Sequence, residues 1–438
     1  MLKAFRPLRY SSSAVGGLSS VVAPPYDVIS DAERDALYAR SEWNSVRLIL
    51  NRDTDRYAAA AGLLAEWRAG GVLVRDAQPV LCYYVENFEV AGIPYERSGM
   101  ISTVRLESFS EGGIRPHERT FAGAKRDRMA LLQACRTNLS SIFGMVASPP
   151  DIFAPAKAES LRRPADIDLQ LDGRCRHRLW LISDDALIAE LTRRFQSETV
   201  FIADGHHRYE TALEYRDTRR RAGENDPAAG FNFIMMYLTS MHDPGLVVLP
   251  THRVIAKGAG LDPDALLARL RDGFDVKPFR RSALDPFRAA LAATPRGRGF
   301  GFAFAGTDEI FVVTLTDTGL LERFAGTQAA AVRSLDVTLL DAVVLRGLGG
   351  LDSTAAERSG HLSYTHDDKD ALALLDQGAA AVFLLSSPRL EDVAAVCLSG
   401  ETMPQKSTYF FPKLLTGLVF NPLDDEPAES IDHRATGA

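Results

Sequence analysis

One stretch, residues 199–217, restricts the fold of this chain more than any other, because it predicts a strand, a tight turn and a helix in direct succession. It reads TVFIADGHHRYETALEYRD. The β-branched and aromatic residues in 199–203 are typical of a buried strand. After the turn, the spacing of Tyr209, Ala212 and Leu213 places three apolar side chains on one face of a helix. Such a unit leaves the first amides of the helix without partners inside the helix, at the positive end of its dipole.

The turn itself, Asp204 to Arg208, carries groups that suit the binding of an anion. Helix N-termini bind phosphate through their amides, Gly205 lets backbone approach a ligand closely, and Arg208 can donate two parallel hydrogen bonds. His206 and His207 add donors. For Asp204 the sequence leaves three roles open: a helix cap, a group that exchanges a proton, or a metal ligand. The alternatives are that the turn serves only the fold, or that the histidines bind zinc, although the chain has no HExxH spacing.

Strand and helix patterns alternate along the rest of the chain. Alternating β-formers around a turn predict hairpins over 79–106 and 299–315, and a strand over 246–255. Apolar residues three and four positions apart predict helices over 57–71 and 125–136. The fold class that follows is α+β or mixed α/β, with mostly short strands.

The length of 438 residues exceeds what a single hydrophobic core usually serves, so we expect more than one domain. We predict a first domain over 1–255, which carries the HERT and DGHHR motifs. A second α/β domain over 256–422 carries the motif PQKST. The polar, proline-containing residues 423–438 predict a disordered tail.

A second concentration of charged residues lies in HERTFAGAKRDRM, from His117 to Met129. Phosphoryl transfer needs a carboxylate that takes the proton of the acceptor hydroxyl and cations that neutralise the transferred group. In this motif Glu118 offers a carboxylate, His117 a contact to the substrate and Arg128 a contact to a phosphate. The alternative interpretation is a charged face that is simply solvated.

The segment PQKSTYFFPK offers Lys406, Ser407 and Thr408 as contacts to a phosphate or carboxylate. Lys-Ser-Thr is similar to the end of a Walker loop, but the glycines that such a loop requires are missing, so the segment is not a P-loop. A surface turn is the alternative. Tyr26 and Asp27, in APPYDVI, are candidates for contacts to substrate or Mg²⁺, against the alternative of a turn anchored by the prolines.

Composition excludes several classes of function. The 50 basic and 57 acidic residues give a net charge of −7, whereas proteins that coat nucleic acid normally present a basic surface. No apolar run approaches the roughly 18 residues that a membrane span needs. The four cysteines lie far apart without a CxxC pair, which is typical of reduced thiols. We therefore expect a cytoplasmic protein with no membrane or nucleic-acid partner.

Four motifs together resemble domain-of-unknown-function family 1015 of bacteria and archaea. They are APPYDVI (23–29), HERTFAGAKRDRM (117–129), ADGHHRYETA (203–212) and MPQKSTYFFPKLLTGLV (403–419). The motif DGHHRYETAL also resembles the signature of the ParB/sulfiredoxin-like superfamily, which includes free serine kinases. The resemblance implies a nucleotide-binding core with an additional α/β domain. In sulfiredoxins this motif carries a catalytic cysteine, whereas this chain has His206 there, which speaks against sulfiredoxin chemistry.

The resemblance implies a phosphotransferase that moves a phosphoryl group between ATP or ADP and a small hydroxylated metabolite, with free L-serine or O-phosphoserine favoured. Mg²⁺ would bridge the phosphates, with no ligand assigned. The implied site comprises Glu118 and Asp204 in catalysis, Tyr26, Asp27 and His117 at the substrate, and Arg128, Gly205, His206, His207, Arg208, Lys406, Ser407 and Thr408 at the phosphates.

Two other functions stay open. One is a ParB-like regulatory or DNA-associated protein that responds to nucleotide, and the other is a phosphatase that needs no nucleotide. The acidic balance and the lack of a clear helix-turn-helix argue against the first. A homodimer is compatible with the sequence.

Overall fold

The computed structural model describes residues 2–120 and 122–424, so most of the tail predicted at 423–438 lies outside the described residues. The chain forms two compact units. Unit 1 comprises Met1–Arg115, Thr120–Leu246 and Pro412–Ala438, and unit 2 comprises Pro116–Arg119 and Val247–Phe411. With 38% helix and 27% strand, the predicted mixed fold class is confirmed. The predicted division at 255/256 stays a prediction.

Unit 1 is built around a nine-stranded sheet in its described part. The strands lie in the order β6-β11-β8-β12-β5-β4-β10-β9, and β1 pairs with β5. Neighbours are antiparallel, except that β11 runs parallel to β6 and β12 parallel to β8. The bounds are β1 (Leu2–Lys3), β4 (Leu81–Val90), β5 (Ile93–Arg105), β6 (Ile114–Arg115), β8 (Ile142–Val146), β9 (Ile167–Leu171), β10 (Cys175–Ile182), β11 (Val200–Asp204) and β12 (Phe233–Ser240).

Two further strand pairs and a set of helices complete unit 1. The pairs are β2 (Leu8–Tyr10) with β3 (Leu73–Arg75), and β7 (Thr137–Asn138) with β21 (Asn421–Pro422). The helices are α1 (Ser12–Val15), α2 (Asp31–Arg40), α3 (Val46–Ile49), α4 (Arg56–Ala69), α5 (Ala122–Cys135), α6 (Ala154–Ser160), α7 (Asp185–Arg194) and α8 (His206–Arg221). The short 3-10 segments are η1 (Leu18–Ser20), η2 (Tyr26–Val28), η3 (Phe109–Glu111), η4 (Pro150–Phe153) and η5 (Gly230–Asn232).

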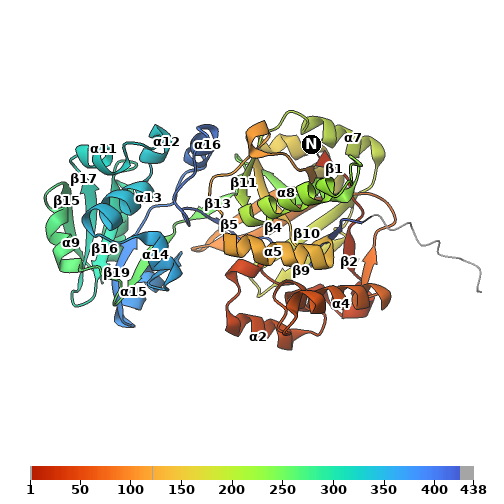
Figure 1. Ribbon diagram of the computed structural model, residues 1–438, viewed down its shortest axis with the longest axis horizontal. Coiled ribbons are helices and arrows are strands. Elements are labelled where there is room, and N and C mark those ends of the chain that lie inside the picture. Colours follow the sequence, from red (N-terminus) through yellow and green to blue (C-terminus); the bar gives the residue numbers. More distant parts are fainter. Residues whose placement is uncertain (1, 121, 425–438) are drawn as a thin grey trace, which may run out of the picture. The chain divides into compact units, whose positions relative to one another are not determined.

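The predicted strand, turn and helix of the opening stretch are confirmed as β11, a turn at Gly205, and α8. Tyr209 and Ala212 are buried in the main core of unit 1, in one cluster with Ile142 and Ile202 from the sheet. The predicted apolar face of the helix therefore packs on the sheet. Helices α5 and α8 lie alongside each other (Figure 1).

Unit 2 contains a six-stranded antiparallel sheet in the order β15-β17-β16-β19-β14-β18, and the pair β13-β20. The strands are β13 (Val247–Leu249), β14 (His252–Ala256), β15 (Phe274–Arg280), β16 (Gly299–Phe304), β17 (Glu309–Leu315), β18 (Leu362–Thr365), β19 (Ala379–Leu384) and β20 (Tyr409–Phe411). The helices are α9 (Pro263–Leu270), α10 (Leu284–Ala292), α11 (Gly319–Ala325), α12 (Ala330–Arg333), α13 (Asp336–Thr338), the π-helix η6 (Leu339–Leu348), α14 (Ser353–Arg358), α15 (Asp368–Asp376) and α16 (Leu390–Leu398).

The hairpins predicted over 79–106 and 299–315 are confirmed as β4-β5 and β16-β17. The single strand predicted over 246–255 is wrong. It divides into β13 and β14, which pair with different partners. The break falls at Pro250, which has no amide hydrogen to donate to a strand ladder. Among the described residues, no helix has the length and apolar character that a membrane crossing requires.

Candidate functional site

The candidate site in unit 1 is centred on Asp204, the last residue of β11. Its Oδ2 accepts a hydrogen bond from Arg208 Nη2 at 2.8 Å, and its Oδ1 accepts one from Lys413 Nζ at 2.6 Å. Gly205 follows with φ 96°, in the left-handed region that glycine adopts readily, and α8 begins at His206. This glycine bends the chain so that one carboxylate holds two cations at the start of a helix.

The charge of Asp204 is fixed by its neighbours. Burial by itself raises the pKa of the Asp204 carboxyl, but the charges of Lys413 and Arg208 outweigh burial and hold that pKa well below its usual value of 3.8. A carboxylate held ionised in this way is a weak proton acceptor, so the geometry favours a role in orienting the two cations. Within the described residues no side chain caps α8, so Asp204 does not act as its cap.

The guanidinium of Arg208 is held on several sides. Its Nη1 donates to Ser140 Oγ at 2.9 Å and to the carbonyl oxygen of Ser141 at 2.6 Å. Its Nε is buried and has no acceptor among the described residues, and the same holds for the hydroxyl of Thr211. Both residues line a cavity of about 60 Å³, together with Arg128. Because buried donors without acceptors are costly, a ligand oxygen in this cavity would stabilise the site.

A larger cavity of about 370 Å³ lies in the same unit, and Arg128 lines both cavities. The guanidinium carbon of Arg128 lies 3.9 Å from the centre of the Tyr26 ring. Its Nε donates to Asp127 Oδ2 at 2.8 Å. Arg34 and Arg56 also line this cavity, so three arginines surround it. Burial raises the pKa of Tyr26, which keeps that phenol in its neutral form.

His117 and Glu118 of the motif HERT contact the motif PQKST within unit 2. His117 Nε2 and Thr408 Oγ1 lie 2.8 Å apart, and Glu118 Oε1 accepts the backbone N–H of Lys406 at 3.1 Å. The N–H of Met403 donates to the carbonyl oxygen of His117 at 2.8 Å. Lys406 has φ 53°, a conformation that residues other than glycine seldom adopt. Four residues assigned from two distant motifs, His117, Glu118, Lys406 and Thr408, therefore come together.

The remaining predicted residues lie in both units. In unit 1, His206 is buried and His207 is half-buried, while Asp27 is the central residue of η2. In unit 2, the hydroxyl of Ser407 donates to the carbonyl oxygen of Pro404. The predicted site residues thus form one group in each unit, and each group is described by itself.

Sequence reasoning missed several residues of unit 1 that the geometry brings to the site. Lys413 stood inside the quoted motif MPQKSTYFFPKLLTGLV, so its charge was a signal that could have been used. Ser140 and Thr211 carried no such signal, because a lone hydroxyl is common on any surface. Their importance comes from their contact with the cavity beside Arg208.

A metal ion could bind here only if carboxylate oxygens of the site were available as ligands. Both carboxylate oxygens of Asp204 accept hydrogen bonds from cations, and Asp127 accepts from Arg56, Tyr57 and Arg128. In the described ranges, no group of three or more histidine, cysteine or acidic residues is arranged to hold a metal. The carboxylates of Asp204 and Asp127 are therefore occupied by these donors and do not fit Mg²⁺ as ligands.

The sequence of residues 2–338 matches the model of a protein family described as "Protein of unknown function (DUF1015)". The chain belongs to this family. The predicted family is therefore confirmed. No curated protein matches the sequence.

Several solved structures are similar to this chain at low identity. A mutant of free serine kinase in complex with ADP is 13% identical, with 71% of this chain and 87% of that chain covered and a TM-score of 0.36. A conserved hypothetical protein from Pyrococcus furiosus is 14% identical, with 72% and 92% covered and a TM-score of 0.35. SbnI from Staphylococcus aureus, truncated at its C-terminus, is 11% identical, with 74% and 90% covered and a TM-score of 0.35. Likenesses this weak carry no conclusion about activity.

Proposed function

We propose that this protein is a phosphotransferase that moves a phosphoryl group between ATP or ADP and a small hydroxylated metabolite, with free L-serine or O-phosphoserine favoured. The observation that carries the proposal is the pair of cations, Arg208 and Lys413, held by Asp204 where α8 begins. Two fixed cations at the positive end of a helix form a site for a phosphate group.

The phosphate contacts follow from the unsatisfied groups at this turn. Arg208 Nε, which has no acceptor in the described part of the chain, would donate to a phosphate oxygen. A hydrogen bond to a charged group contributes about 1.5–3 kcal/mol, whereas the helix dipole contributes at most about 2 kcal/mol. The side chains of Arg208 and Lys413 therefore contribute more to phosphate affinity than the helix dipole does. Gly205 lets the phosphate approach the backbone closely.

The larger cavity is our proposed place for the rest of the nucleotide or for the acceptor. Its volume of about 370 Å³ lies within the range of small-molecule sites. Arg128 lines both cavities, so a ligand that extends from one to the other would pass this guanidinium. Tyr26 offers a neutral phenol and an aromatic face in the larger cavity, which is consistent with the role predicted for it at the substrate.

Glu118 remains our candidate for the general base. Its carboxylate is half-buried, and Oε1 accepts the N–H of Lys406, which fixes its orientation. Phosphoryl transfer to a hydroxyl requires a base that takes the proton of that hydroxyl. Asp204, in contrast, orients cations in this scheme. Mg²⁺ stays a prediction from the resemblance, and no step is routed through it.

Binding is tested by isothermal titration with ATP, ADP and CTP, each with and without Mg²⁺. Arg208→Gln should weaken binding of the favoured nucleotide at least about tenfold, since it removes charged donors to the phosphates. The matched control is Arg221→Gln, which removes an exposed arginine at the opposite end of the same helix. Equal affinities of the two variants would place the phosphates elsewhere.

Transfer is tested by following phosphorus NMR of a mixture of serine and either nucleotide. Phosphoserine should form with the unmodified protein and fall at least about a hundredfold in rate with Glu118→Gln, the range for loss of a general base. Release of phosphate from phosphoserine without nucleotide would favour the phosphatase instead. Nucleotide binding with no transfer to any hydroxylated metabolite would favour the ParB-like regulator.

A further inference from the structure

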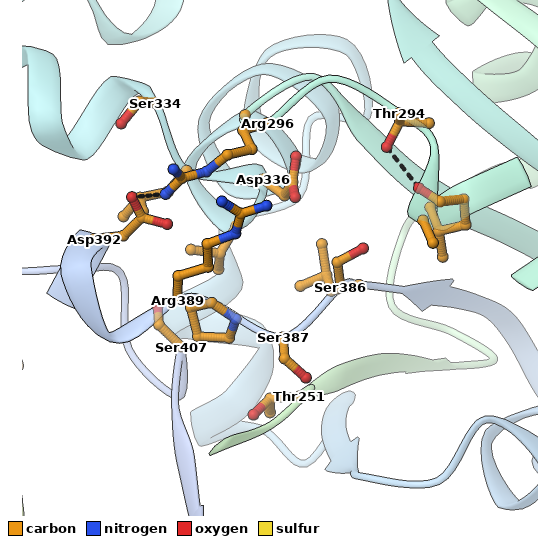
Figure 2. A pocket seen from close by; sticks show the side chains of 17 residues that line it. Thr251, Thr294, Arg296, Ser334, Asp336, Ser386, Ser387, Arg389, Asp392 and Ser407 are labelled. Atoms are coloured by element: carbon orange, nitrogen blue, oxygen red, sulfur yellow. Dashed lines mark hydrogen bonds and ion pairs between the residues drawn. The ribbon is translucent and has the colours of Figure 1, made fainter. Parts of the chain in front are cut away.

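We propose that unit 2 contains a separate binding site for the carboxylate or phosphate group of a small metabolite. A cavity of about 120 Å³, about the volume that four water molecules fill in the liquid, lies within this unit. Three segments line it: the loop 385–389 after β19, the turn 294–297 after α10, and residues 334–337 (Figure 2). Thr251 and Ser407 also line the cavity, together with Leu291, Ala292 and Asp392.

The first observation is a buried donor that has no partner. Thr251 lies between β13 and β14, only 3% exposed, and its hydroxyl has no hydrogen-bond partner in the described part of the chain. The same residue lines the cavity. Since buried hydroxyls are nearly always hydrogen-bonded, we expect a ligand in the cavity to accept a hydrogen bond from the Thr251 hydroxyl. Ser387 adds a second hydroxyl to the lining (Figure 2).

The second observation is an arginine that no carboxylate of the described residues engages. Arg296 forms an ion pair with Asp392, so these two charges cancel. The Asp336 carboxylate faces the cavity as well, and its Oδ1 accepts the N–H of Gly299 at 3.1 Å. Arg389 forms no ion pair among the described residues. Figure 2 shows its guanidinium extending into the cavity. The guanidinium of Arg389 therefore keeps its donors available to a ligand in the cavity.

These features define the class of ligand. A single oxyanion group satisfies both a guanidinium and hydroxyl donors, because its oxygens accept several hydrogen bonds at once. The α16 helix begins directly after Arg389, so its positive end adds to the attraction, although Asp392 in its first turn already uses part of that field. The small volume limits the ligand to an oxyanion group with few further atoms. Arg389 pairs with the oxyanion, and Thr251 donates to it.

The site is tested by isothermal titration of the full chain with inorganic phosphate and with acetate, against chloride at equal ionic strength. Arg389→Gln and Thr251→Val should each weaken the binding of at least one anion about tenfold. Thr251→Val keeps the buried volume, and Arg389 is exposed, so both variants should fold. Arg271→Gln, an exposed arginine of unit 2 outside the cavity, should bind like the unmodified protein.

The preferred anion indicates which kind of metabolite the site binds. A preference for phosphate indicates a phosphorylated metabolite, and a preference for acetate indicates a carboxylic acid. Arg208→Gln separates this site from the one in unit 1, because binding at unit 2 should survive that change. The proposal is overturned if neither anion shows saturable binding to the unmodified protein. It is equally overturned if binding persists in both cavity variants, or disappears only with Arg208→Gln.

Discussion

Lys413 Nζ donates to Asp204 Oδ1 at 2.6 Å, although the two residues are 209 positions apart in the sequence. Between them the chain builds the main segment of unit 2, from 247 to 411, and it then returns to unit 1 at Pro412. Arg208, four residues after Asp204, completes the group. A local turn thus supplies half of the proposed phosphate site, and the returning segment supplies the rest.

Asp204→Asn should lower the free energy of unfolding by about 3–5 kcal/mol, because two nearly buried cations lose their counter-charge. Urea unfolding at neutral pH measures the loss. Asp168→Asn is the matched control. Asp168 pairs with Arg176 at the surface, where such a pair contributes no more than about 1 kcal/mol. Equal losses in the two variants would contradict a special role for Asp204.

The contribution of Asp204 should also depend on pH. Its folded pKa lies below the unfolded value of 3.8, so the unfolded chain takes up the proton first as the pH falls. The stabilisation is complete above that value and is lost progressively below it. The difference in stability between the unmodified protein and Asp204→Asn should therefore shrink as the pH falls below about 3.8. A difference that stays constant there would contradict a lowered pKa.

Gly205→Ala should weaken nucleotide binding about tenfold at a cost of about 1–2 kcal/mol in stability. A Cβ there would lie 3.0 Å from Arg208 Nη2, so that the guanidinium must move, and φ is +96°. Gly223→Ala is the matched control. Its φ is +95°, but no described atom lies within 4 Å of the added Cβ. We expect the two variants to lose similar stability, and only Gly205→Ala to bind nucleotide more weakly. If both variants bound nucleotide equally well, Gly205 would not belong to the site.

Local patterns predicted the strand, the glycine turn and the helix correctly, because their causes lie within a few residues. Tyr209 and Ala212 repeat with the period of a helix, and both are buried as that period requires. Gly205 adopts a positive φ, a conformation that glycine reaches readily. The buried face of α8 and the turn before it could therefore be derived without tertiary information.

Other features arise only from tertiary structure. The contact of Lys413 with Asp204 depends on where the chain returns, which no periodicity encodes. The strand predicted over 246–255 failed at Pro250, although a proline inside a strand pattern is itself a warning. The unsatisfied hydroxyl of Thr251, directly after that break, has meaning only beside a cavity. Sequence identified the residue types of the site, and tertiary contacts determine which of them meet.

His177 should make the protein less stable in mild acid. Burial, and then the charge of Arg97, lower the pKa of His177 to about 4 from 6.5, while its Nδ1 lies 2.7 Å from the Tyr84 hydroxyl. Glu86 is the other charged group facing it, at 3.7 Å. Because the unfolded chain takes up a proton first, stability should fall as the pH drops from about 6.5 to about 4, by about 3 kcal/mol for this group.

The measurement for His177 is urea unfolding at several pH values, compared with His177→Gln. His252, in unit 2, also has a pKa lowered to about 4 by burial, so the unmodified protein has two such groups. The variant should lose only the contribution of His177, and its stability should fall less steeply between pH 6.5 and pH 4. If the stability of the two proteins fell equally with pH, His177 would have the same pKa in the folded and the unfolded state.

Arg97→Met should destabilise unit 1 by about 3–5 kcal/mol, because the fully buried Glu86 would lose its counter-charge. Arg97 Nε donates to Glu86 Oε2 at 2.9 Å, and Nη2 donates to the carbonyl oxygen of Pro412 at 2.8 Å. Adding Glu86→Gln to this variant removes the stranded charge and should restore about 1–3 kcal/mol, measured by urea unfolding. Glu86→Gln alone should be destabilising, because Arg97 then lacks its counter-charge. The loss of stability in the double variant could instead equal the sum of the losses in the two single variants. The pair would then contribute through shape and not through charge.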